Sequence, residues 1–341
     1  MAYTDIDKPS DYFNTAPYSG DSNTTQAITG VGFQPDWVWI KSRSSAANHN
    51  LWDIIRGTSK YLKSNSTDAE ITDATLFNSF NSDGFTVGNG GIVNDSGQTY
   101  VGWCWKGANG TASNTDGSIT STVSANTTSG FSIVSWTGNG STTTVGHGLG
   151  VTPKLYITKD RTNGSTNWHY HTTQIDGGMD FAFLNQTNAF SSSSLSAPSS
   201  TLITVGGTIN TSSANFISYV FAEKKGYSKF GSYTGNGNAD GAFVYTGFKP
   251  AFLLMKRTDS ISQWRMWDNK RDTFNVADQA LLPNNSTATQ ENSNQNVDLL
   301  SNGFKWRASY VDTNASGGTF IYMAFAENPF VTSTGIPACA R

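Results

Sequence analysis

Three landmarks recur three times in the same order along the chain, and this repetition constrains the fold more than any other feature. Each copy opens on a turn rich in glycine, asparagine or aspartate: PYSGDS at 17–22, SWTGNG at 135–140 and SYTGNG at 232–237. A proline followed by an apolar strand comes next, in GFQPDWVWIK at 32–41, GVTPKLYITK at 150–159 and GFKPAFLLMK at 247–256. Each copy closes on an aromatic strand: YVGWCWKG at 100–107, FISYVFAE at 216–223 and FIYMAFAE at 320–327.

The spacing of the copies predicts units of domain size. Pro153 and Pro250 are 97 residues apart, and Ser135 and Ser232 are also 97 residues apart. Periods of this length correspond to whole domains rather than to turns of a solenoid. We therefore expect three tandem β-sandwich-like modules of about 97 residues each. The expected parts are a leader with the first module over 1–107, a Ser/Thr/Gly-rich linker over 108–129, a second module over 130–226, and a third module with a C-terminal tail over 227–341.

The residues within each copy are typical of an all-β fold. Every position from Trp37 to Ile40 is apolar, which predicts a central strand that is covered on both faces. The segments DGFTV at 83–87 and NGFKW at 302–306 predict a further shared turn and strand. Each module should hold six to eight short strands, with short helices expected only around 68–80 and 269–282.

The repeated turn SYTGNG predicts a hairpin rather than a ligand loop. A glycine-rich loop binds phosphate when a helix N-terminus follows it. Here the strand-like segment AFVYTGFKP follows instead. Asn-Gly supplies the positive φ that a type I′ hairpin turn requires, so we interpret the turn as the entrance of each module.

Charge, hydropathy and cysteine content argue against nucleic-acid binding, membrane insertion and a disulfide framework. Only 22 Lys and Arg are spread over 341 residues and the net charge is −3, so no nucleic acid is expected to bind. The chain has no apolar run long enough for membrane insertion, and MAYTDIDKPS lacks the pattern of a signal peptide. Cys104 lies in an apolar run and Cys339 lies two residues from the end, which does not indicate a disulfide framework. The redox state of both cysteines stays open.

Sequence patterns of catalysis are absent. The chain contains no GxSxG, P-loop, HExxH or CxxC motif. Its carboxylates are scattered, and none forms an evident acid/base pair of the kind that glycoside hydrolysis requires. We therefore expect a non-enzymatic protein without a cofactor.

His169 and His171 are the candidate metal ligands. Residues two apart in a strand point to the same face, so the two imidazoles should lie side by side. They could bind a transition metal if a third ligand came from elsewhere, for example on the axis of a symmetric trimer. The alternative is a hydrogen-bonded polar pair, and the other two copies carry no matching pair. Aspartates that could hold Ca²⁺ match no EF-hand spacing: Asp240, Asp259, Asp268, Asp272 and Asp312.

Trp136 and Tyr233 are the candidate ligand-binding residues. They occupy the same place in successive copies, beside the repeated turn. Most other tryptophans fall in apolar strands and are expected in the core. An exposed aromatic ring at the turn could stack on a sugar, so we expect Trp136 in particular to be reachable from solvent.

Nearly the whole chain resembles a family of uncharacterised virion-associated proteins of tailed bacteriophages, especially marine and cyanophage-type phages. The resemblance rests on YFNTAPYSGD, GFQPDWVWIK, TDGSITSTVSANTTSGFSIVSWTGNG, VGHGLGVTPK, FGSYTGNGNADG, VYTGFKPAF and IYMAFAENPF. It implies a structural protein on the surface of the phage particle, made in the cytoplasm of the host bacterium. The expected role is a tail-fibre or appendage component that contacts the host surface. A capsid decoration or cement protein is the alternative, and a glycan-active enzyme is a remote one.

The expected partners follow from this resemblance. They are other virion proteins of the tail or capsid, further copies of the chain in a homo-oligomer such as a trimer, and a glycan of the host surface. The sequence leaves open whether the protein belongs to the tail or to the capsid, and which receptor it contacts.

Overall fold

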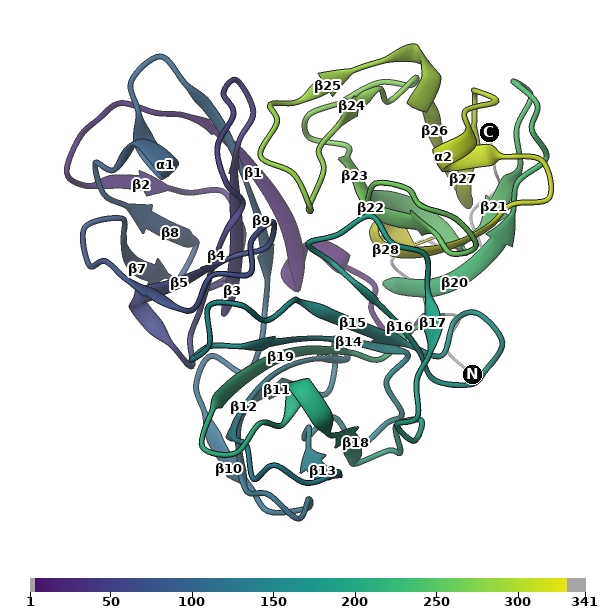
Figure 1. The fold of residues 1–341 in the computed structure, drawn as a ribbon. Coiled ribbons are helices and arrows are strands. Elements are labelled where there is room, and N and C mark those ends of the chain that lie inside the picture. The colour runs from purple at the N-terminus through teal and green to yellow at the C-terminus, as the bar shows by residue number, and fades with distance from the viewer. Residues whose placement is uncertain (1–3, 330–341) are drawn as a thin grey trace.

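The computed structural model describes residues 4–329 as an all-β protein whose large sheets surround a common core (Figure 1). We call the sheets of residues 13–105 the first unit, those of 112–221 the second unit and those of 228–329 the third unit. Figure 1 shows the three units as lobes around one centre. The all-β fold class expected from the sequence is confirmed. The division into three tandem modules of about 97 residues, with the boundaries given above, stays a prediction.

Each unit pairs one large antiparallel sheet with a small one. The first large sheet has the order β1 (Phe13–Ser19), β9 (Thr99–Trp105), β3 (Trp37–Ser42), β4 (Asn50–Asp53), β5 (Gly57–Lys63) and β6 (Ile71–Thr72). Its small sheet is β2 (Gln26–Ile28), β8 (Gly84–Val87) and β7 (Phe77–Asn81).

The second large sheet is the widest of the three. Its order is β10 (Ala112–Asn114), β11 (Ser121–Asn126), β12 (Phe131–Thr137), β19 (Asn215–Phe221), β14 (Leu155–Asp160), β15 (His169–Thr172), β16 (Asp180–Phe183) and β17 (Ser191–Ser192). Its small sheet holds only β13 (Thr143–Gly146) and β18 (Leu202–Val205).

The third large sheet has four strands. They are β20 (Ser228–Thr234), β28 (Thr319–Pro329), β22 (Phe248–Arg257) and β23 (Arg265–Asp268). Its small sheet is β21 (Phe243–Tyr245), β27 (Gly303–Trp306) and β26 (Val297–Leu300), and β24 (Gln279–Ala280) pairs separately with β25 (Gln290–Glu291). The helices of the described residues are each one turn: η1 (Pro9–Asp11), α1 (Gly91–Asn94), η2 (Gly207–Ile209), η3 (Ser293–Gln295) and α2 (Val311–Asn314).

Several expectations from the sequence were wrong. Two strands, β10 and β11, lie in the expected linker 108–129 and extend the second large sheet. The segments 68–80 and 269–282 contain short strands and turns rather than helices. The three units hold nine, ten and nine strands within residues 4–329, more than the expected six to eight, because strands of two or three residues escape a reading of periodicity. The central place of Trp37–Ser42 is confirmed, since β3 lies between β9 and β4 and is buried throughout.

The three large sheets share one strand order and meet in one hydrophobic core. The orders β1-β9-β3-β4, β12-β19-β14-β15 and β20-β28-β22-β23 place the aromatic closing strand beside the apolar proline strand in every unit. Trp37 of the first unit stacks on Trp105 of its own sheet at 4.3 Å and on Tyr219 of the second unit at 4.1 Å. Phe13 stacks on Phe325 of the third unit at 5.1 Å. Each such ring pair adds about 0.5–1.5 kcal/mol to the energy of burial, so the units depend on one another.

The repeated turn is not a hairpin. It is a place where the backbone passes close to the loop that precedes the closing strand. The strands on either side of it, β20 and β21, belong to different sheets, so the hairpin interpretation was wrong. A Cβ at Gly20, Gly138 or Gly235 would lie 2.2–2.3 Å from a backbone carbonyl oxygen of the loop that precedes the closing strand. Glycine is therefore required at this position in all three copies, which explains the repetition.

A buried lysine occupies the same place in each large sheet, opposite the closing strand. Lys41, Lys159 and Lys256 are fully buried, and burial lowers the pKa of Lys41 and Lys159 to about 8 and that of Lys256 to about 7. Lys159 donates to the carbonyl oxygen of Thr67 in the first unit at 3.0 Å, and Lys256 donates to that of Thr187 in the second unit at 3.1 Å. The ammonium groups thus help to join neighbouring units.

Candidate functional site

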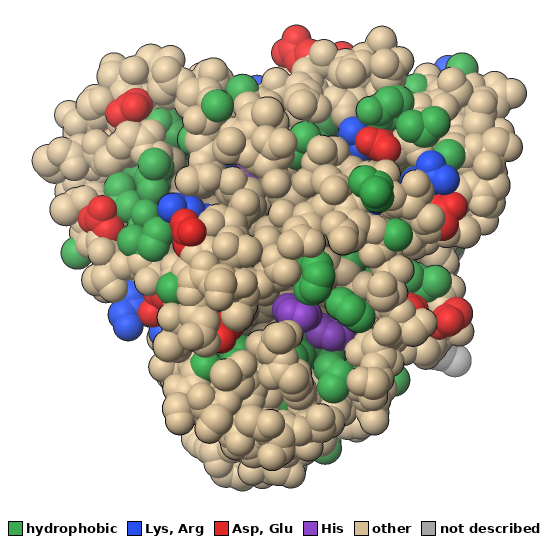
Figure 2. Space-filling view, in the orientation of Figure 1, with side chains coloured by type: hydrophobic (Ala, Val, Ile, Leu, Met, Phe, Trp, Pro, Cys, Tyr) green, Lys and Arg blue, Asp and Glu red, His purple; other side chains and the backbone are tan. Residues whose placement is uncertain are grey.

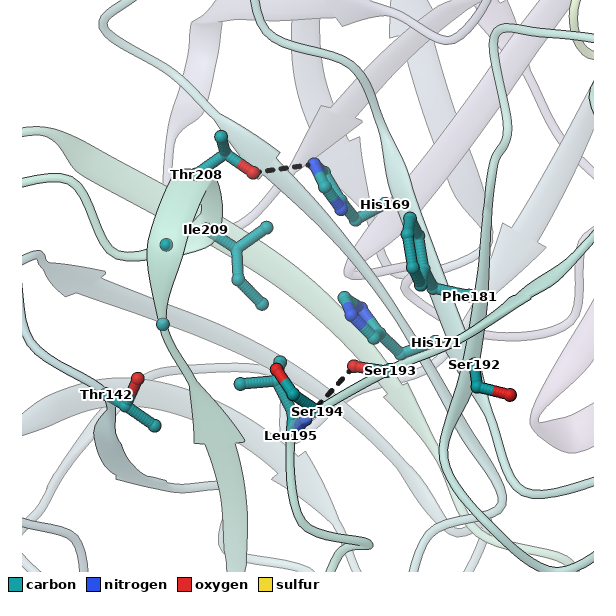
Figure 3. A pocket seen from close by; sticks show the side chains of 12 residues that line it. Thr142, His169, His171, Phe181, Ser192, Ser193, Ser194, Leu195, Thr208 and Ile209 are labelled. Carbon is teal, nitrogen blue, oxygen red and sulfur yellow. Dashed lines mark hydrogen bonds between the residues drawn. The ribbon is translucent and has the colours of Figure 1, made fainter.

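A surface pocket of about 520 Å³ lies in the second unit, between the outer strands of the large sheet and one end of the small sheet (Figure 3). Histidine side chains are visible on this face of the molecule (Figure 2). His169 and His171 of β15 bring their rings into near-parallel contact, with centroids 5.7 Å apart and planes at 10°. The expectation that they share a face is confirmed. The remaining lining is uncharged: Thr142, Phe181, Ser192, Ser193, Ser194, Leu195, Gly206, Gly207, Thr208 and Ile209.

The pocket exists because the second unit lacks a tryptophan that the other two units possess. His171 is the third residue of β15, and the third residues of the corresponding strands β4 and β23 are Trp52 and Trp267. Trp52 stacks on Phe77 of its small sheet at 5.3 Å, and Trp267 packs edge-on against Trp306 at 5.4 Å. An imidazole is far smaller than an indole, so the same position is left underfilled in the second unit.

The small sheet of the second unit also lacks its third strand. In the first and third units, β7 and β26 pair with the middle strand and cover the large sheet beside the tryptophan. In the second unit the middle strand β18 pairs only with β13, and residues 193–201 contain no strand. The missing strand and the smaller side chain together open the pocket to solvent.

At the rim of the pocket, the second unit has a neutral hydrogen bond where the third unit has an ion pair. In the third unit the first residue of β23, Arg265, forms a 2.9 Å ion pair with Asp312 of α2. In the second unit the first residue of β15 is His169, whose Nε2 lies 3.1 Å from the hydroxyl of Thr208 in η2. The second unit thus has an uncharged pair where the third unit has an ion pair.

Both imidazoles are neutral near pH 7. Burial, together with the charge of Lys159, lowers the pKa of His169 to about 4. Burial, together with His169, lowers the pKa of His171 to about 3. His171 is 3% exposed, and its Nδ1 has no hydrogen-bond partner. The pocket therefore presents uncharged donors and acceptors.

The two aromatic candidates, Trp136 and Tyr233, lie outside this pocket and apart from one another. Trp136 is 3% exposed, stacks on Phe216 at 5.3 Å and donates from its indole to Asn210 at 3.1 Å. The expectation of a reachable ring was wrong, because the ring seals the core of the second unit. Tyr233 stacks on Phe320 at 4.9 Å and is half-buried beside a recess of about 270 Å³. Its hydroxyl is engaged by a backbone carbonyl.

The structure brings no complete metal site together. Among residues 4–329 there is no group of three or more His, Cys, Asp or Glu side chains that could hold an ion. Four of the candidate aspartates are engaged in ion pairs with neighbouring Arg or Lys, namely Asp240, Asp259, Asp268 and Asp312. Cys104 is a buried free thiol, and Cys339 lies outside the described residues.

Most residues of the pocket were not among the site residues expected from the sequence. Phe181, Thr208 and the serines at 192–194 belong to no motif, and only the fold brings them to β15. One signal was available, because LWD at 51–53, YHT at 170–172 and MWD at 266–268 place a histidine where the other copies have tryptophan.

No curated protein and no solved structure matches the chain. No helix of the described residues is long and apolar enough to span a membrane. The model of one family, a domain of unknown function (DUF7483), matches residues 8–329. Because this match covers nearly the whole chain, the protein belongs to the DUF7483 family.

Proposed function

We propose that this protein is a non-catalytic structural component of a phage particle, and that it belongs to a tail fibre or appendage that contacts the host surface. The virion assignment is motivated by the resemblance of the sequence segments. The observation that favours surface contact over a purely structural role is the His169/His171 pocket, a ligand-sized recess that one unit has and the others fill. A cement protein needs a docking face, but it does not need such a recess.

The chemistry of the pocket supports binding rather than catalysis. Its ionisable groups are two imidazoles with pKa values of about 4 and 3, and its lining holds no carboxylate. Hydrolysis of a glycosidic bond ordinarily uses two carboxyl groups on either side of the bond. The remote alternative of a glycan-active enzyme is therefore not favoured at this site.

The mutual dependence of the units supports a rigid body suited to display on a particle. Tyr219 of the second unit donates to Asp53 of the first at 2.8 Å, and Trp103 of the first donates to Asp268 of the third at 3.0 Å. Gln174 of the second unit donates to the Tyr322 carbonyl of the third at 2.7 Å. Assembly with other virion proteins and with further copies of the chain belongs to the same proposal, and weak contacts from several copies would add through effective concentration.

Antibody labelling of intact particles tests this function. Gold label on tails or appendages would support the proposal, whereas label spread over heads would favour capsid decoration. Absence of label from both the heads and the tails of the particles would refute a role in the virion. Mass measurement of the purified protein by light scattering tests the homo-oligomer.

A further inference from the structure

The His169/His171 pocket has the properties of a site for an uncharged, hydroxyl-rich ligand, and we propose that it binds one or two rings of a neutral saccharide. This inference rests on the proposed contact with a host surface and names the class of ligand that the contact would use. Three properties of the pocket favour this class of ligand: its charge, its hydrogen-bonding capacity and its shape.

Charge excludes acidic and basic ligands. The lining has no Asp, Glu, Lys or Arg, and the Arg265–Asp312 pair of the third unit is replaced by His169 and Thr208. A charged group that entered the pocket would lose water and meet no counter-charge among the lining residues, which is costly. Sialic and uronic acids should therefore bind more weakly than neutral sugars.

Hydrogen-bonding capacity matches a polyol. The hydroxyls of Thr142, Thr208, Ser193 and Ser194 can each donate and accept, as sugar hydroxyls also can. The imidazole of His171 lies on the floor of the pocket, and its Nδ1 is buried without a hydrogen-bond partner. Figure 3 shows Thr142, Thr208, Ser193 and Ser194 around the rings of His169 and His171, whereas the hydroxyl of Ser192 points away from these rings.

Shape and apolar surface complete the match. Phe181 forms one side of the pocket, with its ring 5.8 Å from that of His171, and Ile209 and Leu195 add aliphatic surface. The C–H face of a pyranose packs against such surface while its hydroxyls meet the polar rim. A volume of about 520 Å³ lies within the range of small-molecule pockets.

The test is direct binding by the purified full-length chain. The probes are glucose, galactose, mannose, N-acetylglucosamine and their β-linked dimers, set against sialic acid and glucuronic acid, and the measurements are calorimetry and saturation-transfer NMR. At least one neutral sugar should bind ten-fold or more tightly than either acid, and EDTA should not change its affinity. No binding of any neutral probe, tighter binding of the acids, or loss of binding in EDTA would each overturn the proposal.

Variants that install residues of the other units locate the site. His171→Trp supplies the indole of the first and third units and should reduce affinity at least ten-fold without lowering the melting temperature. Thr208→Asp supplies the acid of the third unit and should also weaken binding. The matched control is Thr137→Asp, on an exposed position of β12 away from the pocket, which should leave affinity unchanged. Full binding by folded His171→Trp would overturn the assignment of the pocket.

The two proposals can fail separately. Particles labelled on their appendages by a protein that binds no neutral sugar would refute the ligand and keep the function. A protein that binds the sugar through this pocket but is absent from particles would refute the virion role and keep the ligand class.

Discussion

A buried ion pair at the junction of the first and second units allows a quantitative test of how the units depend on one another. Asp53 accepts from the Arg56 guanidinium at 2.5 Å and from the Tyr219 hydroxyl of the second unit at 2.8 Å. The side chains of Asp53 and Arg56 are both fully buried. Arg56 also donates to the carbonyl of Leu51 at 2.8 Å, and its nearest other carboxylate, Glu70, is 3.7 Å away.

Replacement of Asp53 by alanine should destabilise the protein by about 3–5 kcal/mol. The variant leaves the Arg56 charge buried without its closest partner, and loss of one member of a buried pair costs this much. Tyr219→Phe removes only a neutral hydroxyl and should cost about 1–3 kcal/mol. The two changes share one contact, so the double variant should cost less than the sum, with a coupling of about 0.5–3 kcal/mol.

Unfolding in urea, followed by tryptophan fluorescence, measures these free energies. The control is Asp116→Ala, an exposed carboxylate that should change stability by less than about 0.5 kcal/mol. The corresponding pair of the third unit is Asp268–Arg271, at 2.6 Å, so Asp268→Ala should behave like Asp53→Ala. A cost below about 1 kcal/mol for both buried aspartates would refute the reasoning.

Three further predictions concern single positions. Gly235→Ala should lower the free energy of unfolding, measured by chemical denaturation, by about 1–3 kcal/mol, because its Cβ would lie 2.3 Å from a carbonyl oxygen. The control Gly110→Ala, which has open space around it, should leave stability unchanged. Equal costs for the two variants would contradict the steric argument. The pKa of Lys159 falls from 10.5 to about 8 in the folded protein, so between these values the unfolded chain binds more protons and stability rises with pH. The cost of Lys159→Met should therefore increase by up to about 3 kcal/mol from pH 7 to pH 10.5, and a pH-independent cost would disprove the shift. Burial raises the pKa of the Cys104 thiol, so a Cys339→Ser variant should react with a thiol reagent only after unfolding, and rapid labelling of the native protein would contradict the burial.

The sequence predicts those parts of the fold whose pattern is local. Trp37–Ile40 is apolar at every position, which only a strand covered on both faces explains, and β3 is such a strand. The stretch 108–129 is polar and was taken for a linker, but β10 and β11 lie toward one edge of the second sheet, where polar residues are tolerated. Composition alone cannot separate such strands from loops.

The sequence predicted the histidine pair of the candidate site but not the burial of Trp136 or the pocket. Period-two alternation places His169 and His171 on one face, and this was confirmed. The burial of Trp136 depends on a neighbouring strand and on Asn210, more than 70 residues away, which no local pattern contains. The pocket arises because the second unit lacks a tryptophan and a third strand in its small sheet. The missing tryptophan can be recognised only when β4, β15 and β23 are compared in register.

The covalent linkage of the three units has a consequence for how a site can arise in such a protein. In a ring of three identical chains, one substitution occurs in every subunit. Exchanging a tryptophan for a histidine would then leave an underfilled position in all three subunits at once. In this chain the exchange appears once, at His171, while Trp52 and Trp267 keep the equivalent positions filled. Two thirds of the ring can thus retain its packing while the remaining third is free to change.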